Sequence, residues 1–338
     1  MLDRRVITFG DKLCHNMEGD KLQSTLPHYA YLRIADGCSN KCSYCAIPLI
    51  RGKMRSRKME NIIEEAKKFA ENGVKELVIV AQDVTAYGID LYKKYALPDL
   101  LKQLCKIDGI KWIRLLYCYP ERMTDELIET IKTEDKVLNY IDIPIQHCNK
   151  EILRNMYRGG DEQSLRELFA KLRREIPGVV LRTTLITGFP GETEEQFSEL
   201  AEFVNDIKFE RLGCFAYSAE EDTPAAEMPD QVDEGERQRR ADIITSEQEI
   251  RMGEYYAGMV GNTYEVVCEG FDRYSDMYFG RSMHFAPEID GMIYFTSAKD
   301  KGSLTIGDFV NVKITDVLEN NLLGAVSYTH LRAHETTL

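Results

Sequence analysis

The sequence predicts an α/β fold, in which six βα units form a partial (βα)6 barrel and a small all-β barrel follows. Three observations predict it. Six short apolar or β-branched runs alternate with amphipathic helical segments between residues 31 and 216. Short strands separated by Gly, Asp and Asn turns fill residues 263–326. The length of 338 residues suits one large and one small domain.

The expected elements of the first domain follow from the period of their apolar residues. We expect strands at Tyr31–Ala35, Glu76–Ala81, Trp112–Tyr117, Tyr140–Ile145, Val180–Ile186 and Arg211–Ala216. We expect helices at Glu60–Glu71, Leu97–Ile107, Asp125–Ile131, Ser164–Glu175 and Glu194–Ile207. Thr124 and Thr193 precede first-turn acids, as helix N-caps do. Barrels of this kind carry their chemistry on the loops after the strands, so we expect the site there.

The pattern changes after Tyr217. Residues 218–236 are polar, acidic and proline-containing, which predicts a surface loop, and a long helix is expected over about Asp233–Tyr256. Five short strands between Thr263 and Val326 predict the small barrel. Residues 327–338 continue none of these patterns, and we expect them to be a non-native tail.

Composition narrows the class of protein. Hydrophobic residues make up 43% and charged residues 29%, and no apolar run approaches the roughly 20 residues that span a bilayer. The N-terminus lacks the apolar segment of a secretory signal, so we expect a cytoplasmic protein with no membrane partner. The net charge of −13 disfavours binding to a phosphate backbone and favours a basic partner, although such charge also simply keeps proteins soluble.

Three of the nine cysteines cluster directly after the first expected strand. Cys38, Cys42 and Cys45 form a CxxxCxxC motif, whereas the other six are scattered singly and are expected to act as small buried apolar residues. Disulfides are not expected in a reducing compartment. Three thiolates on one loop can ligate three irons of a 4Fe-4S cluster and leave the fourth iron open. Structural zinc is the weaker alternative, because it usually takes four protein ligands and no second cysteine pair exists.

The motif, with an aromatic residue before its third cysteine, resembles the radical S-adenosylmethionine superfamily. That resemblance implies that the amino and carboxyl groups of S-adenosylmethionine bind the open iron, and that one electron from the cluster breaks the sulfonium bond to give a 5′-deoxyadenosyl radical. The turn GFPGET after the fifth strand resembles the superfamily's cofactor-contacting turn. The implied cofactor contacts are Tyr44, Gln146, Ile186, Gly188, Gly191 and Glu192. A buried, hydrogen-bonded pair of Gln146 with His147 is the alternative for that position, and no catalytic acid or base is named.

Further segments resemble the methylthiotransferases of this superfamily across nearly the whole chain: YIDIPIQHCN (140–149), RNMYRGG (154–160) and FAYSAEEDTPAA (215–226). The C-terminal strands resemble the family's TRAM domain. One branch modifies an isopentenyladenosine of tRNA, and another modifies an aspartate of small-subunit ribosomal protein S twelve. Residues 45–57, 83–92, 116–128 and 280–291 resemble the second branch.

Charge also favours the second branch. Ten acidic side chains outnumber five basic ones in the expected TRAM barrel, which suits a basic ribosomal protein better than RNA, unless these charges are ordinary solvated surface. The basic run Arg51, Lys53, Arg55, Arg57 and Lys58 could steer an acidic group or hold the cofactor carboxylate, with solvated loop charge as the alternative. The tRNA enzyme remains an alternative function. A non-catalytic cluster- or zinc-bearing module that binds the ribosome is the alternative of another class.

The family resemblance implies a domain plan. Methylthiotransferases carry an N-terminal domain with three more cysteines for an auxiliary 4Fe-4S cluster, and residues 1–28 resemble only its trailing linker. We expect the radical S-adenosylmethionine core at 29–255, the TRAM domain at 256–326 and the tail at 327–338. We therefore expect a truncated protein that cleaves S-adenosylmethionine, with a flavodoxin or ferredoxin as electron donor, but does not complete the transfer.

Overall fold

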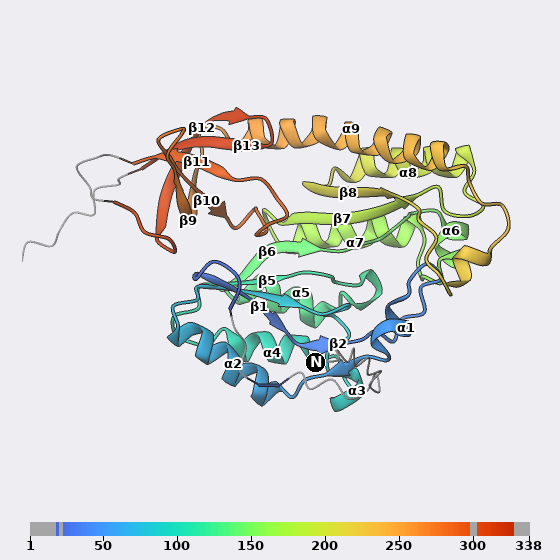
Figure 1. The fold of residues 1–338 in the computed structure, drawn as a ribbon, viewed down its shortest axis with the longest axis horizontal. Helices are drawn as coiled ribbons and strands as arrows, with labels where there is room; N and C mark the ends of the chain where they lie inside the picture. Colours follow the sequence, from blue (N-terminus) through green and yellow to red (C-terminus); the bar gives the residue numbers. More distant parts are fainter. Residues whose placement is uncertain (1–17, 20–22, 298–302, 328–338) are drawn as a thin grey trace, which may run out of the picture.

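The computed structural model describes residues 18–19, 23–297 and 303–327. It contains a six-stranded parallel sheet and a closed five-stranded barrel, connected by the long helix α9 (Glu234–Met259) (Figure 1). The predicted fold class is confirmed. Most of the predicted linker, Cys14 included, and nearly all of the predicted tail lie outside the described residues. The domain boundaries themselves stay a prediction.

The sheet has the strand order of the sequence, with every neighbouring pair parallel: β1 (Tyr29–Arg33), β4 (Glu76–Val80), β5 (Trp112–Leu115), β6 (Val137–Asp142), β7 (Val180–Thr187) and β8 (Arg211–Ala216). Helices cover its outer face: α2 (Met59–Glu71), α4 (Leu97–Leu104), α5 (Asp125–Thr133), α7 (Glu162–Glu175) and α8 (Glu194–Ile207) (Figure 1). Shorter elements lie in the strand-end loops: β2 (Ala35–Asp36), α1 (Ile47–Arg51), β3 (Arg55–Ser56), α3 (Ile89–Tyr92), η1 (Pro120–Arg122), α6 (Lys150–Asn155) and η2 (Pro224–Glu227).

Two predicted strands are shifted toward the N-terminus. The first was expected from Tyr31 but begins at Tyr29, and the backbone then turns into β2, which pairs antiparallel with β3. The fourth was expected to reach Ile145 but ends at Asp142. Pro144 has no N–H to continue the ladder, and a single bridge between Gln146 and Leu185 is all that follows.

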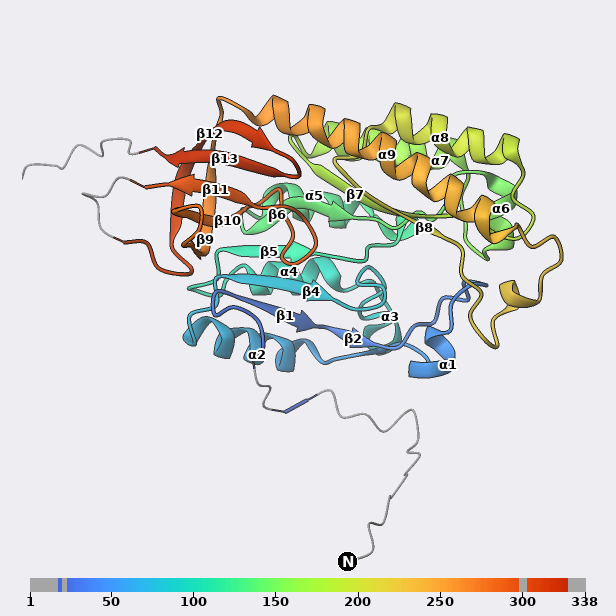
Figure 2. The same ribbon diagram turned by 45° about the horizontal axis from the view of Figure 1, so that its top comes forward.

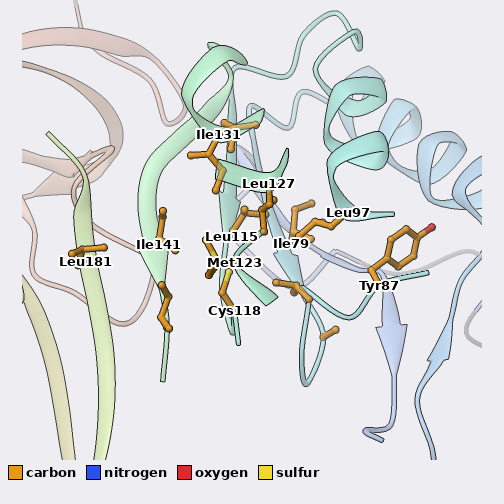
Figure 3. Close-up of a cluster of buried hydrophobic side chains, with 14 of the residues drawn as sticks. Ile79, Tyr87, Leu97, Leu115, Cys118, Met123, Leu127, Ile131, Ile141 and Leu181 are labelled. Carbon is orange, nitrogen blue, oxygen red and sulfur yellow. The ribbon is translucent and has the colours of Figure 1, made fainter. Parts of the chain in front are cut away.

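Alternation along each strand creates two apolar layers. Side chains on the outer face of the sheet pack under the helices, as Ile79, Leu115, Ile141 and Leu181 do in Figure 3. The alternate side chains face the inside of the curved sheet and form a second cluster, which includes Tyr29, Val78, Trp112, Leu116 and Tyr140. Helices α5 and α8 begin where predicted: Thr124 accepts a hydrogen bond from Leu127 N, and Thr193 forms a capping box with Gln196. Helix α2 begins at Met59 rather than Glu60, and α7 begins at Glu162 rather than Ser164.

The small barrel closes in the order β10-β11-β13-β12-β9, with β9 (Thr263–Asp272), β10 (Met277–Ser282), β11 (Ile293–Thr296), β12 (Phe309–Leu318) and β13 (Asn321–Val326). It lies at the end of the sheet where the parallel strands begin (Figure 2). The loop between β10 and β11 reaches into the curved sheet, where Ala286 joins the inner apolar cluster and Asp290 accepts a hydrogen bond from Tyr140 Oη at 2.8 Å.

A buried charge network joins the two parts. Arg281 of β10 donates to Glu76 of β4 at 2.8 Å and to Glu269 of β9 at 2.8 Å, and Arg114 of β5 donates to Glu76 at 2.7 Å. His28 lies 3.0 Å from Glu269. Glu269 and Asp290 are therefore internal partners, so the predicted acid surface of the barrel is smaller than the sequence count indicates.

The prediction that residues 218–236 form a surface loop is wrong in part. Thr223 and Ala225 are buried, and Ala225 N donates to Ser43 O at 2.9 Å inside the cysteine loop. The segment thus packs on the predicted site. No helix in the described part of the protein is long and apolar enough to cross a membrane.

Candidate active site

A cavity of about 480 Å³ opens at the carboxyl ends of β1, β4, β5, β6 and β7, at the opposite end of the sheet from the small barrel. All three clustered cysteines line it, as do Tyr44 and Gln146 among the predicted cofactor contacts. The remaining described lining residues are Arg33, Ala35, Asn40, Ile47, Val80, Ala81, Gln82, Tyr117, Cys118, Tyr119, Pro144, Arg158 and Thr184. The site thus lies at the strand ends, where the fold class predicts it.

Backbone hydrogen bonds shape the cysteine loop. Cys38 N donates to Gly52 O, Cys45 N donates to Cys42 O, and Ser43 N donates to Met156 O. Gly37 has a left-handed φ of 72°, and a Cβ added there would lie 2.4 Å from Lys53 O. Only glycine fits this position, because both the backbone conformation and the close approach exclude a side chain.

The arrangement of the thiols differs from that of a single-ion site. Among the described residues, no three His, Cys, Asp or Glu side chains are close enough together to hold one metal ion. Burial raises the pKa of the Cys38 and Cys45 thiols, and the neighbouring Cys42 raises it further. A multi-iron cluster fits such a set, because each cysteine can bind a different iron and the metal holds each sulfur as thiolate.

A second feature of the cavity fits a ligand with an N–H donor. The side-chain amide oxygen of Gln82, Oε1, is buried and makes no hydrogen bond within the described residues. The amino group of S-adenosylmethionine carries N–H donors of the kind that this oxygen lacks. The cavity residues therefore fit both the cluster and its cosubstrate.

Arg158 fixes the cavity wall next to the cysteines. Its guanidinium donates to Pro144 O at 2.7 Å and to Tyr44 Oη at 3.4 Å, and it stacks over the Tyr119 ring. Burial raises the pKa of the Tyr44 and Tyr119 hydroxyls strongly, so both stay protonated. The Tyr119 hydroxyl lies 3.8 Å from Cys42 Sγ, where it can donate to a thiolate.

Asn40 connects the cysteine loop to the loop after β4. Its amide donates to Asp83 Oδ2 at 3.1 Å and accepts from Arg122 Nη2 at 2.8 Å, while Arg122 also pairs with Asp83. The three side chains hold the strand-end loops in one arrangement.

Two cavity residues have a left-handed backbone without being glycine. Tyr117, at the end of β5, has a φ of 64°, and Gln146, after β6, has a φ of 71°. The Asp142 carboxylate accepts from Tyr117 N at 3.0 Å, and Gln146 bonds Thr184 and Ile186 of β7 through its backbone. Such conformations cost about 1–3 kcal/mol each and are typical of functional sites.

The predicted turn at residues 188–192 is built differently from the cavity wall. Glu192 accepts from Gly188 N at 2.9 Å and from Arg240 of α9 at 2.7 Å, and it lies 3.6 Å from His147 Nε2. A Cβ at Gly188 would lie 2.3 Å from Arg237 Cγ, so protein occupies the room that the missing side chain leaves. Gly191 has a φ of 82° with open space around it.

Gly188, Gly191 and Glu192 do not line the described cavity, whereas Ile186 lines a smaller one beside it, together with Tyr44 and Gln146. The assignment of all six as cofactor contacts stays a prediction.

The three arginines of the basic run after the cysteine loop are paired with carboxylates, whereas Lys53 and Lys58 are exposed. Arg51 and Arg55 both pair with Asp36, and Arg57 is buried and pairs with Glu18 and Glu65. These arginines stabilise the loop through ion pairs within the protein, so they are not free to bind an anionic ligand.

Sequence reasoning missed Arg33, Gln82, Tyr117, Tyr119 and Arg158 as cavity residues. Gln82 and Tyr117 stand at the ends of expected strands, and that position was the available signal, whereas Arg33 lies in the middle of the expected first strand and ends only the observed one. Arg158 lies in the segment RNMYRGG (154–160), which carries the family resemblance, but its place in the cavity was not predicted because tertiary packing brings α6 and the residues after it to the cysteines.

The protein was compared with known proteins. The Radical SAM superfamily model matches residues 32–204, and the TRAM domain model matches residues 260–326. A protein from Clostridium botulinum named ribosomal protein uS12 methylthiotransferase RimO is 50% identical over 309 residues, covering 91% of this chain and 68% of the relative. The chain belongs to the RimO family. A RimO protein from Caldanaerobacter subterraneus is 49% identical over 322 residues, covering 95% of this chain and 72% of the relative.

RimO proteins are radical S-adenosylmethionine enzymes of the transferase class, and a 4Fe-4S cluster and S-adenosylmethionine are the cofactors of that superfamily. Two solved structures share the fold of the first domain. Coproporphyrinogen III oxidase from Escherichia coli matches with a TM-score of 0.51 and 18% identity, over 68% of this chain and 54% of that one. The radical S-adenosylmethionine methyltransferase TsrM from Kitasatospora setae matches with a TM-score of 0.50 and 16% identity, over 59% and 38%.

Proposed function

We propose that this protein acts in the methylthiolation of an aspartate of ribosomal protein uS12, with a 4Fe-4S cluster held by Cys38, Cys42 and Cys45. The observation that carries this proposal is that the three cysteines line one cavity at the strand ends. The 50% identity to a RimO protein supports it. When bound, the cluster and S-adenosylmethionine supply reductive cleavage of the sulfonium and the radical chemistry that follows.

The protein residues bind, orient and shield. Tyr119 can donate a hydrogen bond toward Cys42, and the Arg158 guanidinium stacks over the Tyr119 ring and so fixes its position. The side-chain oxygen of Gln82, Oε1, can accept a hydrogen bond from the amino group of S-adenosylmethionine. Tyr44, Gln146 and Ile186 line the adjacent pocket wall, where we propose that the nucleoside lies.

The remaining expectations belong to the same proposal. The core would span residues 29–255 and the TRAM domain 256–326, and a flavodoxin or ferredoxin of the cytoplasm would supply the electron. An auxiliary 4Fe-4S cluster, from which sulfur is donated, would be held by three further cysteines of an N-terminal domain and not by the cysteines that the structure describes.

The function can be tested with the anaerobically reconstituted protein, S-adenosylmethionine and a reductant. We expect added ribosomal protein uS12 to stimulate formation of 5′-deoxyadenosine, whereas added tRNA does not. This readout does not depend on the source of sulfur. Stimulation by tRNA alone would support the tRNA methylthiotransferase instead.

Metal analysis separates the non-catalytic alternative. We expect iron and acid-labile sulfide at about four each per protein molecule. One zinc per molecule, with no 5′-deoxyadenosine under any condition, would support a ribosome-binding module without catalysis.

A further inference from the structure

We propose that Arg33 binds the carboxylate of the substrate aspartate inside the cavity. The inference rests on the proposed function, and it names the residue that would distinguish an acidic protein side chain from a neutral nucleoside. It does not involve the cysteines or the predicted cofactor contacts.

The position of Arg33 follows from strand alternation. It is the last residue of β1 and shares the inner face of the sheet with Tyr29 and Tyr31. Both tyrosines donate to Glu288, in the loop between β10 and β11 of the small barrel. This loop covers the inner face of the sheet at that level. Arg33 lies one layer above them and lines the cavity together with Cys38. The Arg33 side chain therefore faces the cavity from the side nearer the small barrel.

The guanidinium of Arg33 is uncommitted. Within the described residues, its side chain makes no hydrogen bond or ion pair, and Asp36 is a nearby carboxylate whose pKa its charge helps to lower. Both Asp36 oxygens are already bound, Oδ1 by Arg51 at 2.9 Å and Oδ2 by Arg55 at 3.2 Å. Arg158, the other cation of the described lining, donates to Pro144 and Tyr44.

The described lining of the cavity offers Arg33 no protein carboxylate as a partner. The described lining residues include no Asp or Glu. A partly desolvated guanidinium without a partner is costly, and a planar carboxylate is the ligand that its parallel N–H groups fit best. The site is thus prepared for a carboxylate that arrives with a ligand.

Two carboxylates come with the proposed reaction. In the superfamily the carboxyl group of S-adenosylmethionine binds the open iron, so that charge already has a partner. The substrate aspartate brings the second, and its single methylene carbon is bonded directly to that carboxylate. A bidentate arginine would therefore fix the methylene C–H bonds of the aspartate relative to the cofactor. The adenine of a tRNA nucleoside has no charge to match it.

The experiment compares two peptides of the substrate loop of uS12, identical except that one carries Asn in place of the substrate Asp. Dissociation constants are measured anaerobically with the reconstituted protein and S-adenosylmethionine, for wild type, Arg33→Met and Arg33→Lys. Lys53→Met serves as the control, because Lys53 is an exposed cation near the cysteine loop that does not line the cavity. Affinity for S-adenosylmethionine is measured for each variant.

We expect wild type and Lys53→Met to prefer the Asp peptide by about tenfold or more, as a charge-assisted pair predicts. Arg33→Met should bind both peptides equally and keep its affinity for S-adenosylmethionine. Arg33→Lys should retain a reduced preference, because lysine keeps the positive charge but lacks the paired N–H donors that bind a carboxylate through both oxygens. If Arg33→Met does not fold, a preference in Arg33→Lys equal to wild type would overturn the proposal.

An unchanged Asp preference in Arg33→Met overturns the proposal. So does a loss of S-adenosylmethionine affinity with the peptide ratio intact, because Arg33 would then serve the cofactor. Failure of the proposed function looks different: wild type would bind neither peptide and would bind tRNA.

Discussion

The guanidinium of Arg158 lies 4.2 Å from the centroid of the Tyr119 ring, and the Tyr119 hydroxyl is 3.8 Å from Cys42 Sγ. Arg158 follows α6, whereas Tyr119 follows β5 and Cys42 lies between β2 and α1. One cation thus holds three strand-end segments together at the cysteines.

Replacing Arg158 should loosen this wall. Arg158→Met leaves the half-buried Pro144 carbonyl without its donor, and we expect a loss of about 2 kcal/mol in the free energy of unfolding and faster loss of iron. Chemical denaturation and iron release to a chelator measure the two effects. Arg154→Met is the matched control, because Arg154 is exposed on α6. Equal behaviour of the two variants would contradict the assigned role.

The cysteines should separate into ligands and packing residues. Substitution of Cys38, Cys42 or Cys45 by Ser should abolish the visible absorbance of the reconstituted protein and its iron content. Cys105→Ala is the control, because Cys105 is half-buried at the end of α4 and remote from the cavity lining. Retention of a full cluster by any of the three Ser variants would remove that residue from the ligand set.

Gly37 should tolerate no side chain. Gly37→Ala combines a left-handed φ with a Cβ 2.4 Å from Lys53 O, and we expect it to lower stability by about 2 kcal/mol and to reduce cluster incorporation. In Gly253→Ala, within α9, the added methyl meets nothing within 4 Å, so that variant should be as stable as wild type or more so. Thermal melting of both variants provides the check.

The junction of the two domains should depend on pH. Burial alone would raise the pKa of Glu76, but Arg281 and Arg114 lower it to about 2, against 4.5 for the free side chain. Because the folded pKa is the lower one, the stabilisation is present in full above pH 4.5 and is lost as the pH falls toward 2.

Unfolding free energies at about pH 7 and about pH 3 measure this dependence. We expect Glu76→Gln to be about 3 kcal/mol less stable than wild type at the neutral pH, and the difference to shrink at the acidic one. Asp272→Asn is the control, because Asp272 lies on the barrel surface and bonds only its own turn. A constant difference across this range would argue against a charged Glu76 in the folded protein.

Local pattern was sufficient for much of the fold. Short apolar or β-branched runs marked the six parallel strands, and Thr124 and Thr193 marked helix starts, because both signals depend on neighbouring residues only. One error came from a local feature, the missing N–H of Pro144, and another from a distant contact. The strand predicted to reach Ile145 ends before Pro144, and Ala225 is buried because the cysteine loop packs on it.

The sequence by itself determined the fold class, the family and the three clustered cysteines, because strand alternation and motif spacing depend only on the order of the residues. Only the tertiary structure decided which charges are free. Arg51, Arg55 and Arg57 look available in the sequence and are paired, whereas Arg33 looks like an ordinary strand residue and faces the cavity without a partner among the described residues. Pairing is a property of side chains brought together from remote segments, and no local pattern records it.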